Sequence, residues 1–393
     1  MSTPLATKSG AFRLATRLEA VGFSDIVLIR NKVMELQAQG ESVLQFQGGE
    51  PFRPTPDHIK EAMWRAVQEN KTRYAPSSGI MELRVALAAK LNAQNQIPAQ
   101  AENVIVMNGG MQGLHGAFQS VVDTGDEVLV FSPMWTPVKD LIAHCRGVVV
   151  YVATEEARAN GFAATMAKYA NDKTRAIYYN TPQNPSGVVF TRAEAEAVAA
   201  FAQERDLIVI ADEAYETLVY EGEHVSIASL PGMFERSITC FTYSKTYSMT
   251  GWRLGYTVAA EPWLSGLKKT LLYSTNGVST PTQWAGLAAL ETPPEYFAEL
   301  RGEYLERRDL LVNGLNELGL TCTPPAGAFY AFPDATPIHA DSRQASDILL
   351  AQAKVATVPG IVFGPQGEGQ LRFTFSTSKD TITAGLEALR RYL

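Results

Sequence analysis

The sequence predicts an α/β fold in which helices cover both faces of a mainly parallel sheet, joined to a smaller α+β domain. Short apolar, β-branched segments alternate with helix-like segments between about residue 100 and residue 260, and this alternation is typical of parallel sheets. After about residue 290 the alternation stops and long amphipathic segments begin. The length of 393 residues favours more than one domain.

The large domain is predicted to contain buried strands joined by helices. The strand-like segments are, in chain order, NVIVMN, DEVLVFS, GVVVYVA, RAIYYN, DLIVIADE, SITCFTYS and LGYTVAA. Among the helix-like segments, TRAEAEAVAAFAQER has Thr191 at its N-cap position and Glu194 three residues later. This spacing predicts a capping box at the start of a helix.

The C-terminal part is predicted to form the smaller domain. TPPEYFAELRGEYLERRDLLVNGLNELG indicates one long amphipathic helix. AGAFYAFPDA, a helix near 343–356, QLRFTFSTS and a closing helix that ends in LRRYL follow. We therefore expect an N-terminal arm that forms part of the small domain (1–45), a large ligand-binding domain (46–290) and a small C-terminal domain (291–393).

Composition excludes several classes of protein. The formal net charge is −7 and no long basic run occurs, so nucleic acid is not an expected partner. A run such as VVVYVA is far shorter than the roughly 18 apolar residues of a membrane span. Cys145, Cys240 and Cys322 are far apart and form no CxxC pair, which predicts neither a disulfide framework nor a metal site. With no apolar signal core at the N-terminus, we expect a cytoplasmic protein.

Charged residues stand where several predicted strands end. Asp212 follows the apolar run of DLIVIADE, Lys245 closes SITCFTYS, and Arg253 lies just beyond. Ligands of open α/β folds bind beyond the carboxyl ends of the strands, and a buried charge needs a partner. One ligand that carries both a cationic group and a phosphate could pair with Asp212 through the cation and with Lys245 and Arg253 through the phosphate.

Two further loops point to the same edge of the sheet. In NVIVMNGGMQGLHGAF, the backbone amides of Gly110 and Met111 would face an anion at a helix N-terminus. Asn108 stands where a dinucleotide-binding motif needs glycine, so the turn suits a single phosphate better than a nucleotide. In TPQNPSG, Asn184 is held between prolines and can donate and accept hydrogen bonds. Taken alone, each loop is also compatible with an ordinary βα turn or an Asx turn.

Five motifs in order resemble those of one family of enzymes. QGGEPFRPTP resembles its GEPDFxTP stretch, RYAPSSGIMELR its Tyr-x-x-x-Gly-x-x-x-Leu-Arg segment, and TPQNPSG its NPxNPTG loop. ADEAY resembles its DExY site, and YSKTYSMTGWRLGY its lysine segment. The chain thus resembles the pyridoxal-5′-phosphate (PLP) enzymes of fold type I, and among them the class I/II aminotransferases similar to bacterial aspartate and aromatic aminotransferases.

The resemblance implies a role for each residue of the site. Lys245 would hold PLP as a Schiff base and move the substrate proton, with its pKa lowered by burial and a nearby arginine. Asp212 would keep the pyridine nitrogen protonated, and Tyr215 would hydrogen-bond the phenolic oxygen of the ring. These three are the expected catalytic residues. The other expected cofactor contacts are Gly110, Met111, Thr242, Ser244 and Arg253 at the phosphate, Asn184 at the phenolic oxygen, Trp135 on the ring face, and Tyr74 of a neighbouring subunit.

The implied reaction moves the amino group of an L-α-amino acid to a 2-oxo acid by a ping-pong mechanism. Arg372 would bind the substrate α-carboxylate through two parallel hydrogen bonds, helped by Asn184 and the backbone of Gly49. Because Tyr74 matches a tyrosine that reaches the phosphate of the neighbouring subunit, a homodimer is part of the expectation.

The sequence departs from the family pattern at three places. Ser186 replaces the usual threonine of the asparagine loop, which keeps a hydroxyl group. Phe52-Arg53 stands where Asp-Phe is commoner, and Met111 stands where acid-specific relatives often carry lysine. Met111, with Trp135, Phe23 and Ile26, predicts a pocket for apolar or aromatic side chains. Arg53 or Arg30 could instead receive a distal carboxylate.

Two other functions use the same motifs. A PLP-dependent lyase, such as a C–S β-lyase, or a biosynthetic cyclase would need the same Lys245, Asp212 and Arg372. An aminotransferase-like sensor domain of a regulator would normally be attached to a DNA-binding domain, and no basic helix-turn-helix segment precedes the fold here.

Overall fold

The computed structural model describes residues 14–393. Its centre is a seven-stranded sheet in the order β2-β8-β7-β6-β5-β3-β4. The strands are β2 (Val104–Met107), β3 (Glu127–Ser132), β4 (Val148–Ala153), β5 (Thr174–Asn180), β6 (Ile208–Asp212), β7 (Ser237–Thr242) and β8 (Gly255–Ala259). All seven strand-like segments of the sequence are therefore confirmed.

The sheet is parallel except at β8, which runs antiparallel to both β7 and β2. Parallel neighbours need a crossover connection, usually a helix. Between β7 and β8 the chain forms only the one-turn helix α10 (Tyr243–Thr246) and tight turns. The chain therefore returns in the opposite direction, and α10 stands at the edge where the parallel strands end.

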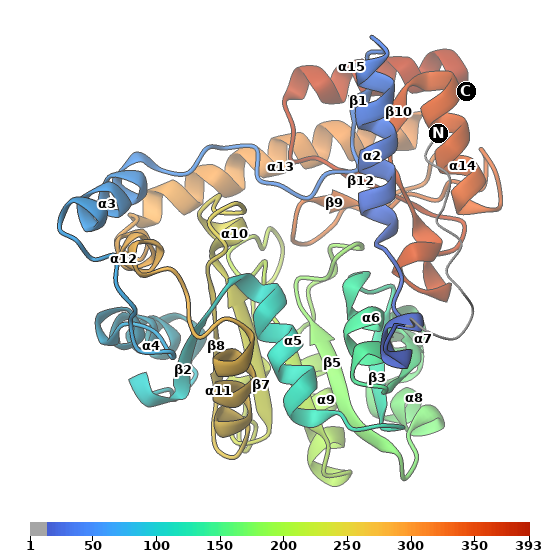
Figure 1. The fold of residues 1–393 in the computed structure, drawn as a ribbon. Coiled ribbons are helices and arrows are strands. Elements are labelled where there is room, and N and C mark those ends of the chain that lie inside the picture. Colours follow the sequence, from blue (N-terminus) through green and yellow to red (C-terminus); the bar gives the residue numbers. More distant parts are fainter. Residues whose placement is uncertain (1–13) are drawn as a thin grey trace, which may run out of the picture.

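Helices cover both faces of the sheet (Figure 1). One face packs against α5 (Gly109–Val121), α6 (Pro137–His144) and α11 (Trp263–Ser274). The other packs against α7 (Thr154–Asn160), α8 (Phe162–Tyr169) and α9 (Arg192–Glu204). Beside β2 and β8 lie α3 (Asp57–Gln68), α4 (Met81–Asn95) and α12 (Thr280–Ala289). Helix α9 begins with the expected capping box, in which the Thr191 side chain accepts from Glu194 N and the Glu194 side chain accepts from Thr191 N.

The side chains of successive residues in a central strand lie on opposite faces of the sheet, because a β-strand repeats every two residues. Tyr178 of β5 and Ile210 of β6 are buried in the cluster with α5 and α6. Their neighbours Tyr179 and Ala211 are buried in the cluster with α8 and α9. Because both faces are covered, the strands are apolar on both sides, which is why they could be recognised as continuous apolar runs.

The second, smaller part of the molecule is α+β. Helix α13 (Pro294–Glu317) runs from beside α3 and α12 towards this part (Figure 1). An antiparallel sheet of order β11-β12-β9 lies in it, with β9 (Tyr330–Ala331), β11 (Val358–Pro359) and β12 (Leu371–Thr374). The closing helix α15 (Lys379–Tyr392) packs against α13.

The helix expected near 343–356 is shorter than the sequence indicates. Helix α14 (Ser342–Ile348) continues as a π-helical turn (Leu349–Ala353), and Lys354 then takes a left-handed conformation with φ of 56°. The next two residues form β10 (Val355–Ala356), which pairs in parallel with β1 (Leu44–Gln45). Strand pairing with a segment 311 residues earlier in the chain thus overrides the helical pattern of this stretch, which local sequence cannot show.

The N-terminal segment contacts the C-terminal part of the chain. Helix α1 (Thr16–Glu19) is followed by α2 (Asp25–Ala38). Salt bridges join Lys32 to Asp347 at 2.7 Å and Asp25 to Arg343 at 2.8 Å. The expectation of an arm also covers residues 1–13, which lie outside the described residues.

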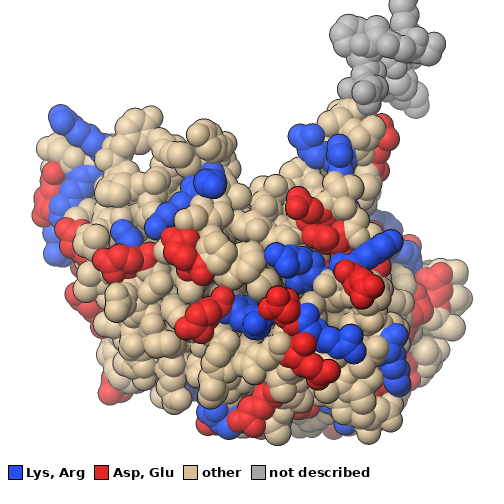
Figure 2. All heavy atoms as spheres, turned by 90° about the horizontal axis from the view of Figure 1, so that it is seen from below, with Lys and Arg blue, Asp and Glu red and all other residues tan. Residues whose placement is uncertain are grey.

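The surface carries charges of both signs. Figure 2 shows basic and acidic side chains interspersed on the face that it draws. Between residues 14 and 393, none of the helices combines the length and the apolar character needed to span a bilayer.

Candidate active site

A cavity of about 380 Å³ lies where the parallel strands end and the C-terminal part covers them. Apart from Tyr74, every residue that the resemblance assigned to the cofactor or to the substrate α-carboxylate lines it. These residues are Gly49, Gly110, Met111, Trp135, Asn184, Asp212, Tyr215, Thr242, Ser244, Lys245, Arg253 and Arg372. The fold therefore brings together groups that are up to 323 positions apart in the chain.

Lys245 lies on α10, whose N-cap Thr242 accepts a hydrogen bond from Ser244 N at 3.1 Å. Its ammonium group donates to the backbone carbonyl of Gly49. Burial lowers the pKa of Lys245 to about 8, and the positive charges of Arg372 and Arg253 act in the same direction. A lysine with such a pKa is partly neutral near pH 8, as a nucleophile and proton carrier must be.

Asp212 ends β6 and is buried, with 6% of its surface exposed. Its carboxylate accepts a hydrogen bond from the Tyr178 hydroxyl at 2.7 Å and a longer one from Ala214 N at 3.3 Å. Burial raises the pKa of Asp212 to about 6, although both hydrogen bonds favour the charged form. In the part of the chain that the structure describes, Asp212 forms no salt bridge. Its buried carboxylate could therefore pair with a cationic ligand.

The same cavity contains donors that could bind an anion, and we call this group of donors the phosphate cradle. Gly109 and Gly110 begin α5, and the N-cap Asn108 gives the first turn no side-chain cap, so amide groups of that turn remain available to a ligand. The guanidinium of Arg253 lies so close to Gly109 that a Cβ there would be 2.8 Å from Arg253 Nη2. The hydroxyl of Thr242 donates to that of Ser244 at 2.9 Å on the same side. Amides, hydroxyls and a guanidinium are the donors that bind a phosphate group.

Arg372 is fully buried, with 2% of its surface exposed. Its Nη1 donates to Asn184 Oδ1 at 3.1 Å and its Nη2 to the carbonyl of Gln47 at 2.8 Å, whereas its Nε has no hydrogen-bond partner. Burial lowers the pKa of Arg372 from its usual value. Among residues 14–393 no carboxylate pairs with this guanidinium, although it lines the cavity. A buried arginine with an unused donor fits a carboxylate ligand.

Aromatic groups complete the cavity. The hydroxyls of Tyr215 and Tyr330 lie 3.1 Å apart, and the Arg372 guanidinium lies 4.3 Å from the centre of the Tyr330 ring. Trp135 is half-buried between β3 and α6 and also lines the cavity. Burial raises the pKa of Tyr215 well above its usual value, so its hydroxyl keeps its proton and can donate it to an oxygen of a ligand.

These features fit the cofactor that the resemblance implies. PLP carries a ring nitrogen that is cationic when protonated, a phosphate, and an aldehyde that reacts with an amine. The cavity offers a buried carboxylate without a salt bridge in Asp212, donors around Gly109 and Arg253, and the amine of Lys245. The donor set of the site thus matches the three reactive parts of PLP.

Four residues of the sequence analysis do not line the cavity, namely Tyr74, Phe23, Arg30 and Arg53. Tyr74 is 95% exposed, and Phe23 is 91% exposed and does not line the cavity, whereas Ile26 does. Arg53 donates to Glu303 at 2.6 Å, so its charge is already paired.

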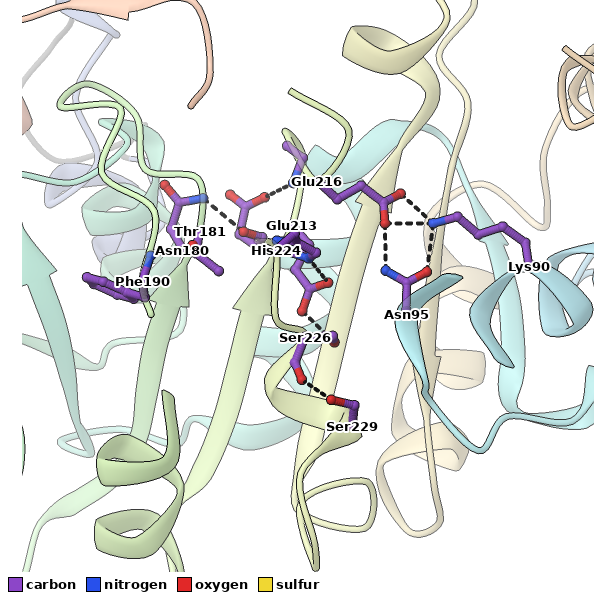
Figure 3. A network of polar contacts seen from close by, with 12 residues as sticks. Lys90, Asn95, Asn180, Thr181, Phe190, Glu213, Glu216, His224, Ser226 and Ser229 are labelled. Carbon is purple, nitrogen blue, oxygen red and sulfur yellow. Dashed lines mark hydrogen bonds and ion pairs between the residues drawn. The ribbon is translucent and has the colours of Figure 1, made fainter. Parts of the chain in front are cut away.

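A second carboxylate network includes Glu213, the residue after Asp212, together with His224, Ser226 and Glu216 (Figure 3). Glu213 accepts from Ser226 Oγ at 2.7 Å and pairs with His224 Nε2 at 2.8 Å. Burial opposes a charged His224 ring, but the Glu213 carboxylate outweighs it and raises the pKa of His224. Nearby, Lys90 and Asn95 donate to Glu216.

One ligand atom from each of Glu213, Glu216 and His224 lies within 4.8 Å of the other two, which would also suit a metal ion. Each carboxylate is nevertheless satisfied by protein donors, and Lys90 supplies a positive charge to Glu216. The arrangement is that of a buried salt-bridge network that secures the end of β6.

Sequence reasoning missed Tyr178 and Tyr330. Tyr178 lies two residues before Asn180, and Asn180 pairs with Asp212 in the sheet. A register drawn from the two strand ends would have placed Tyr178 on the face of Asp212. Tyr330 stands in AGAFYAFPDA and reaches the site from the second part of the molecule. No local signal marks it, because its contact depends on how the two parts pack.

Comparisons with known proteins agree with this geometry. The profile of the family "Aminotransferase class I and II" matches residues 41–389. An aspartate/prephenate aminotransferase of Thermus thermophilus is 39% identical over 390 residues, covering 97% of this chain and 98% of the relative. Aromatic-amino-acid aminotransferase 2 of Thermococcus litoralis is 37% identical, covering 97% and 98%. The solved structure of an aspartate aminotransferase from Thermus thermophilus with maleate superposes with a TM-score of 0.93 at 38% identity, covering 98% of this chain and all of the other (100%).

Proposed function

The chain belongs to the class I and II aminotransferases. On that premise we propose a binding or catalytic role for each residue of the site and a preference among substrates. The protein has the PLP-dependent transferase fold of type I and is a PLP-dependent aminotransferase that acts on amino acids and 2-oxo acids. When bound, PLP supplies an aldehyde that exchanges with the amino group and a ring that stabilises the electrons of the broken Cα–H bond.

The proposed roles follow from the position of each group. Arg372 binds the substrate α-carboxylate with its guanidinium, assisted by Asn184 and by the backbone of Gly49. Lys245 would hold the cofactor through its amine and, when that amine is free, would move the proton from the substrate Cα. A pKa of about 8 leaves part of the amine unprotonated near neutral to slightly basic pH, and that form can accept the proton.

The remaining groups hold the cofactor in place. Asp212 keeps the proton on the ring nitrogen, and Tyr215 and Asn184 donate to the phenolic oxygen. Trp135 packs on the ring face, which excludes water. The phosphate is bound by the amides of Gly110 and Met111 and by Thr242, Ser244 and Arg253.

We propose that apolar and aromatic L-amino acids are better substrates than aspartate. The observation that carries this proposal is the set of cations in the cavity: Lys245, Arg253 and Arg372 line it, and each has one of the roles above. Arg53 is held by Glu303, and Arg30 does not line the cavity. Met111, Leu114, Trp135 and Ile26 are apolar residues of the cavity lining. A distal carboxylate would be buried there without a partner, which is costly.

Steady-state kinetics with a panel of amino acids and 2-oxo acids tests this preference. We expect a higher kcat/KM for phenylalanine, methionine and leucine than for aspartate. Met111→Lys should raise kcat/KM for aspartate and lower it for phenylalanine, since a cation would then face the side chain. A wild-type kcat/KM for aspartate well above the other three would overturn the apolar pocket, whereas the assignment of the cofactor residues would stand.

The proposal extends to domains, assembly and location. We propose that residues 1–45 form an N-terminal arm and part of the small domain, residues 46–290 the large PLP-binding domain, and residues 291–393 the small C-terminal domain. The pairing of β1 with β10 supports this division. The working unit is a homodimer in which Tyr74 reaches the phosphate site of the partner, as its exposed position allows. All three cysteines are unpaired, which suits the cytoplasm, where thiols stay reduced.

A further inference from the structure

Tyr178 is the main polar contact of the Asp212 side chain. The hydroxyl of Tyr178 donates to Asp212 Oδ2 at 2.7 Å, a distance typical of a hydrogen bond to a charged oxygen. Within residues 14–393, the Asp212 side chain accepts one other hydrogen bond, from Ala214 N, which is longer at 3.3 Å. Tyr178 is 1% exposed, so water does not replace this contact.

The register of the sheet explains how Tyr178 reaches the carboxylate. In the pairing of β5 with β6, Tyr178 is opposite Ile210, and Asn180 is opposite Asp212. Tyr178 and Asp212 therefore lie on the same face of the sheet, one pair apart, within reach of a long aromatic side chain. The ring of Tyr178 packs beside Phe118 of α5, with centroids 6.2 Å apart, which limits the positions available to its hydroxyl.

The backbone of Asp212 is held independently. Asn180 Nδ2 donates to Asp212 O at 2.9 Å, a contact drawn in Figure 3. Glu213, the next residue, is anchored by His224 and Ser226. Removal of the Tyr178 hydroxyl would thus release the side chain of Asp212 and leave the end of β6 in place.

We propose that Tyr178 is a positioning residue, whose hydroxyl orients the Asp212 carboxylate towards the cofactor ring nitrogen and keeps the shared proton on that nitrogen. This inference rests on the role proposed above for Asp212. A carboxylate that accepts a second hydrogen bond is a weaker base, so the proton between the two groups stays with the ring. Without the hydroxyl, the carboxylate is the stronger base and draws the proton from the ring nitrogen.

The other ionisable groups around Asp212 have different positions. Lys245 on α10 favours a charged Asp212, and Glu213 on the opposite face opposes it. Burial raises the pKa of Cys240 on β7 and of Tyr215 beyond β6, and the negative charge of Asp212 acts in the same direction, so both groups stay protonated. Of these groups, Tyr178 is the one that donates a side-chain hydrogen bond to the Asp212 carboxylate.

The same strand provides a matched control. Tyr179 is also fully buried, but it points to the other face of the sheet, where its hydroxyl has no hydrogen-bond partner. Tyr178→Phe and Tyr179→Phe each remove one buried hydroxyl from β5, and Tyr178→Phe alone removes a contact with Asp212. Thermal unfolding of both holoenzymes checks that they fold.

The test uses holoenzyme loaded with PLP that is ¹⁵N-labelled in the ring, since the ¹⁵N chemical shift reports protonation of that nitrogen directly. In Tyr178→Phe we expect the shift to move towards that of unprotonated pyridine and kcat to fall about tenfold. KM for the amino acid should stay close to wild type, because Arg372 is untouched. Tyr179→Phe should match wild type in all three measurements.

Other outcomes would overturn the proposal. A Tyr178→Phe holoenzyme with the wild-type ¹⁵N shift would show that the hydroxyl does not act on the ring proton, even if kcat falls. In the Asp212→Asn background, Tyr178→Phe should leave the ¹⁵N shift unchanged, and a further change there would show that Tyr178 acts by another route. If the wild-type ring nitrogen is unprotonated, the role of Asp212 itself fails, and that result is distinct from a failure confined to Tyr178.

Discussion

At the scale of single residues, the site is built from buried charged groups that form no salt bridge within residues 14–393. Asp212 and Arg372 each lack a salt bridge within residues 14–393, and the ammonium of Lys245 is held by a backbone carbonyl. Burial makes each charged form costly, as the shifted pKa of all three groups shows. Ligands with complementary charges relieve this cost, so the site is prepared for a cofactor and a carboxylate substrate.

Asp212→Asn should separate catalysis from stability. The pKa of Asp212 is raised from 3.8 to about 6 by folding. The group is protonated in both states at pH 3, and ionised in both above pH 7. Its ionisation therefore costs the folded apoprotein up to about 3 kcal/mol, and that cost appears as the pH rises from about 4 to 6. The amide has no such cost, but it cannot keep a proton on the ring nitrogen.

We therefore expect the Asn variant to be more stable than wild type as apoprotein at pH 7 and similar at pH 4, in urea unfolding. Turnover of the holoenzyme should fall by two or more orders of magnitude (about 100-fold or greater). Near-normal turnover in this variant would refute the contact between Asp212 and the cofactor.

Arg372→Lys should impair substrate use without loss of the cofactor. The guanidinium can bind a carboxylate in two parallel hydrogen bonds, and an ammonium group cannot reproduce that geometry. We expect kcat/KM for amino acids to fall at least tenfold, or about 1.4 kcal/mol, with the dissociation constant of PLP close to wild type. An unchanged kcat/KM would mean that another group binds the α-carboxylate.

At the scale of elements, helix α5 places its first amides beside Arg253, and glycine at its start makes this approach possible. Gly109 has φ of 77°, and a Cβ on it would be 2.8 Å from Arg253 Nη2. Gly109→Ala should displace the guanidinium from the phosphate cradle, and we expect PLP affinity to fall at least about tenfold in a fluorescence titration.

Gly125 is the matched control for Gly109. It has φ of 90°, and an added Cβ meets no atom within 4 Å. Gly125→Ala therefore introduces comparable backbone strain without displacing a side chain, and its PLP affinity should equal that of wild type. Equal PLP affinity in Gly109→Ala and Gly125→Ala would contradict the proposal that Arg253 and the start of α5 bind the phosphate.

The elements that could be predicted from sequence are those with a local signal. Strands such as β5 and β6 are apolar on both faces, and α9 begins with the Thr191 capping box. The order of the strands, the reversal of β8 and the pairing of β1 with β10 depend on contacts between distant segments. The same division holds in the site. Residues at strand ends could be proposed from the sequence, whereas Tyr178 could be recognised only from the register of β5 with β6, and Tyr330 only from the packing of the two parts of the molecule.

At the scale of the whole molecule, exposed aromatic groups point to a second copy of the chain. Tyr74 and Tyr273 are 95% and 87% exposed, and Trp64 is also exposed. We expect sedimentation at twice the chain mass of 42.8 kDa. Tyr74→Phe should leave the dimer intact and weaken PLP binding, because one hydrogen bond to the phosphate is lost. A monomer with full activity would exclude this arrangement.

The half-reaction with an amino acid tests the central claim, that this cavity performs transamination through Lys245. Holoenzyme mixed with an excess of L-phenylalanine, without any 2-oxo acid, should release one equivalent of phenylpyruvate per subunit and then stop. The cofactor should be recovered as pyridoxamine phosphate, and borohydride reduction of untreated holoenzyme should fix PLP on Lys245. With cysteine or an S-conjugate as donor, continuous release of pyruvate and ammonia without accumulation of pyridoxamine phosphate, together with no half-reaction on phenylalanine or any other amino acid, would contradict the account.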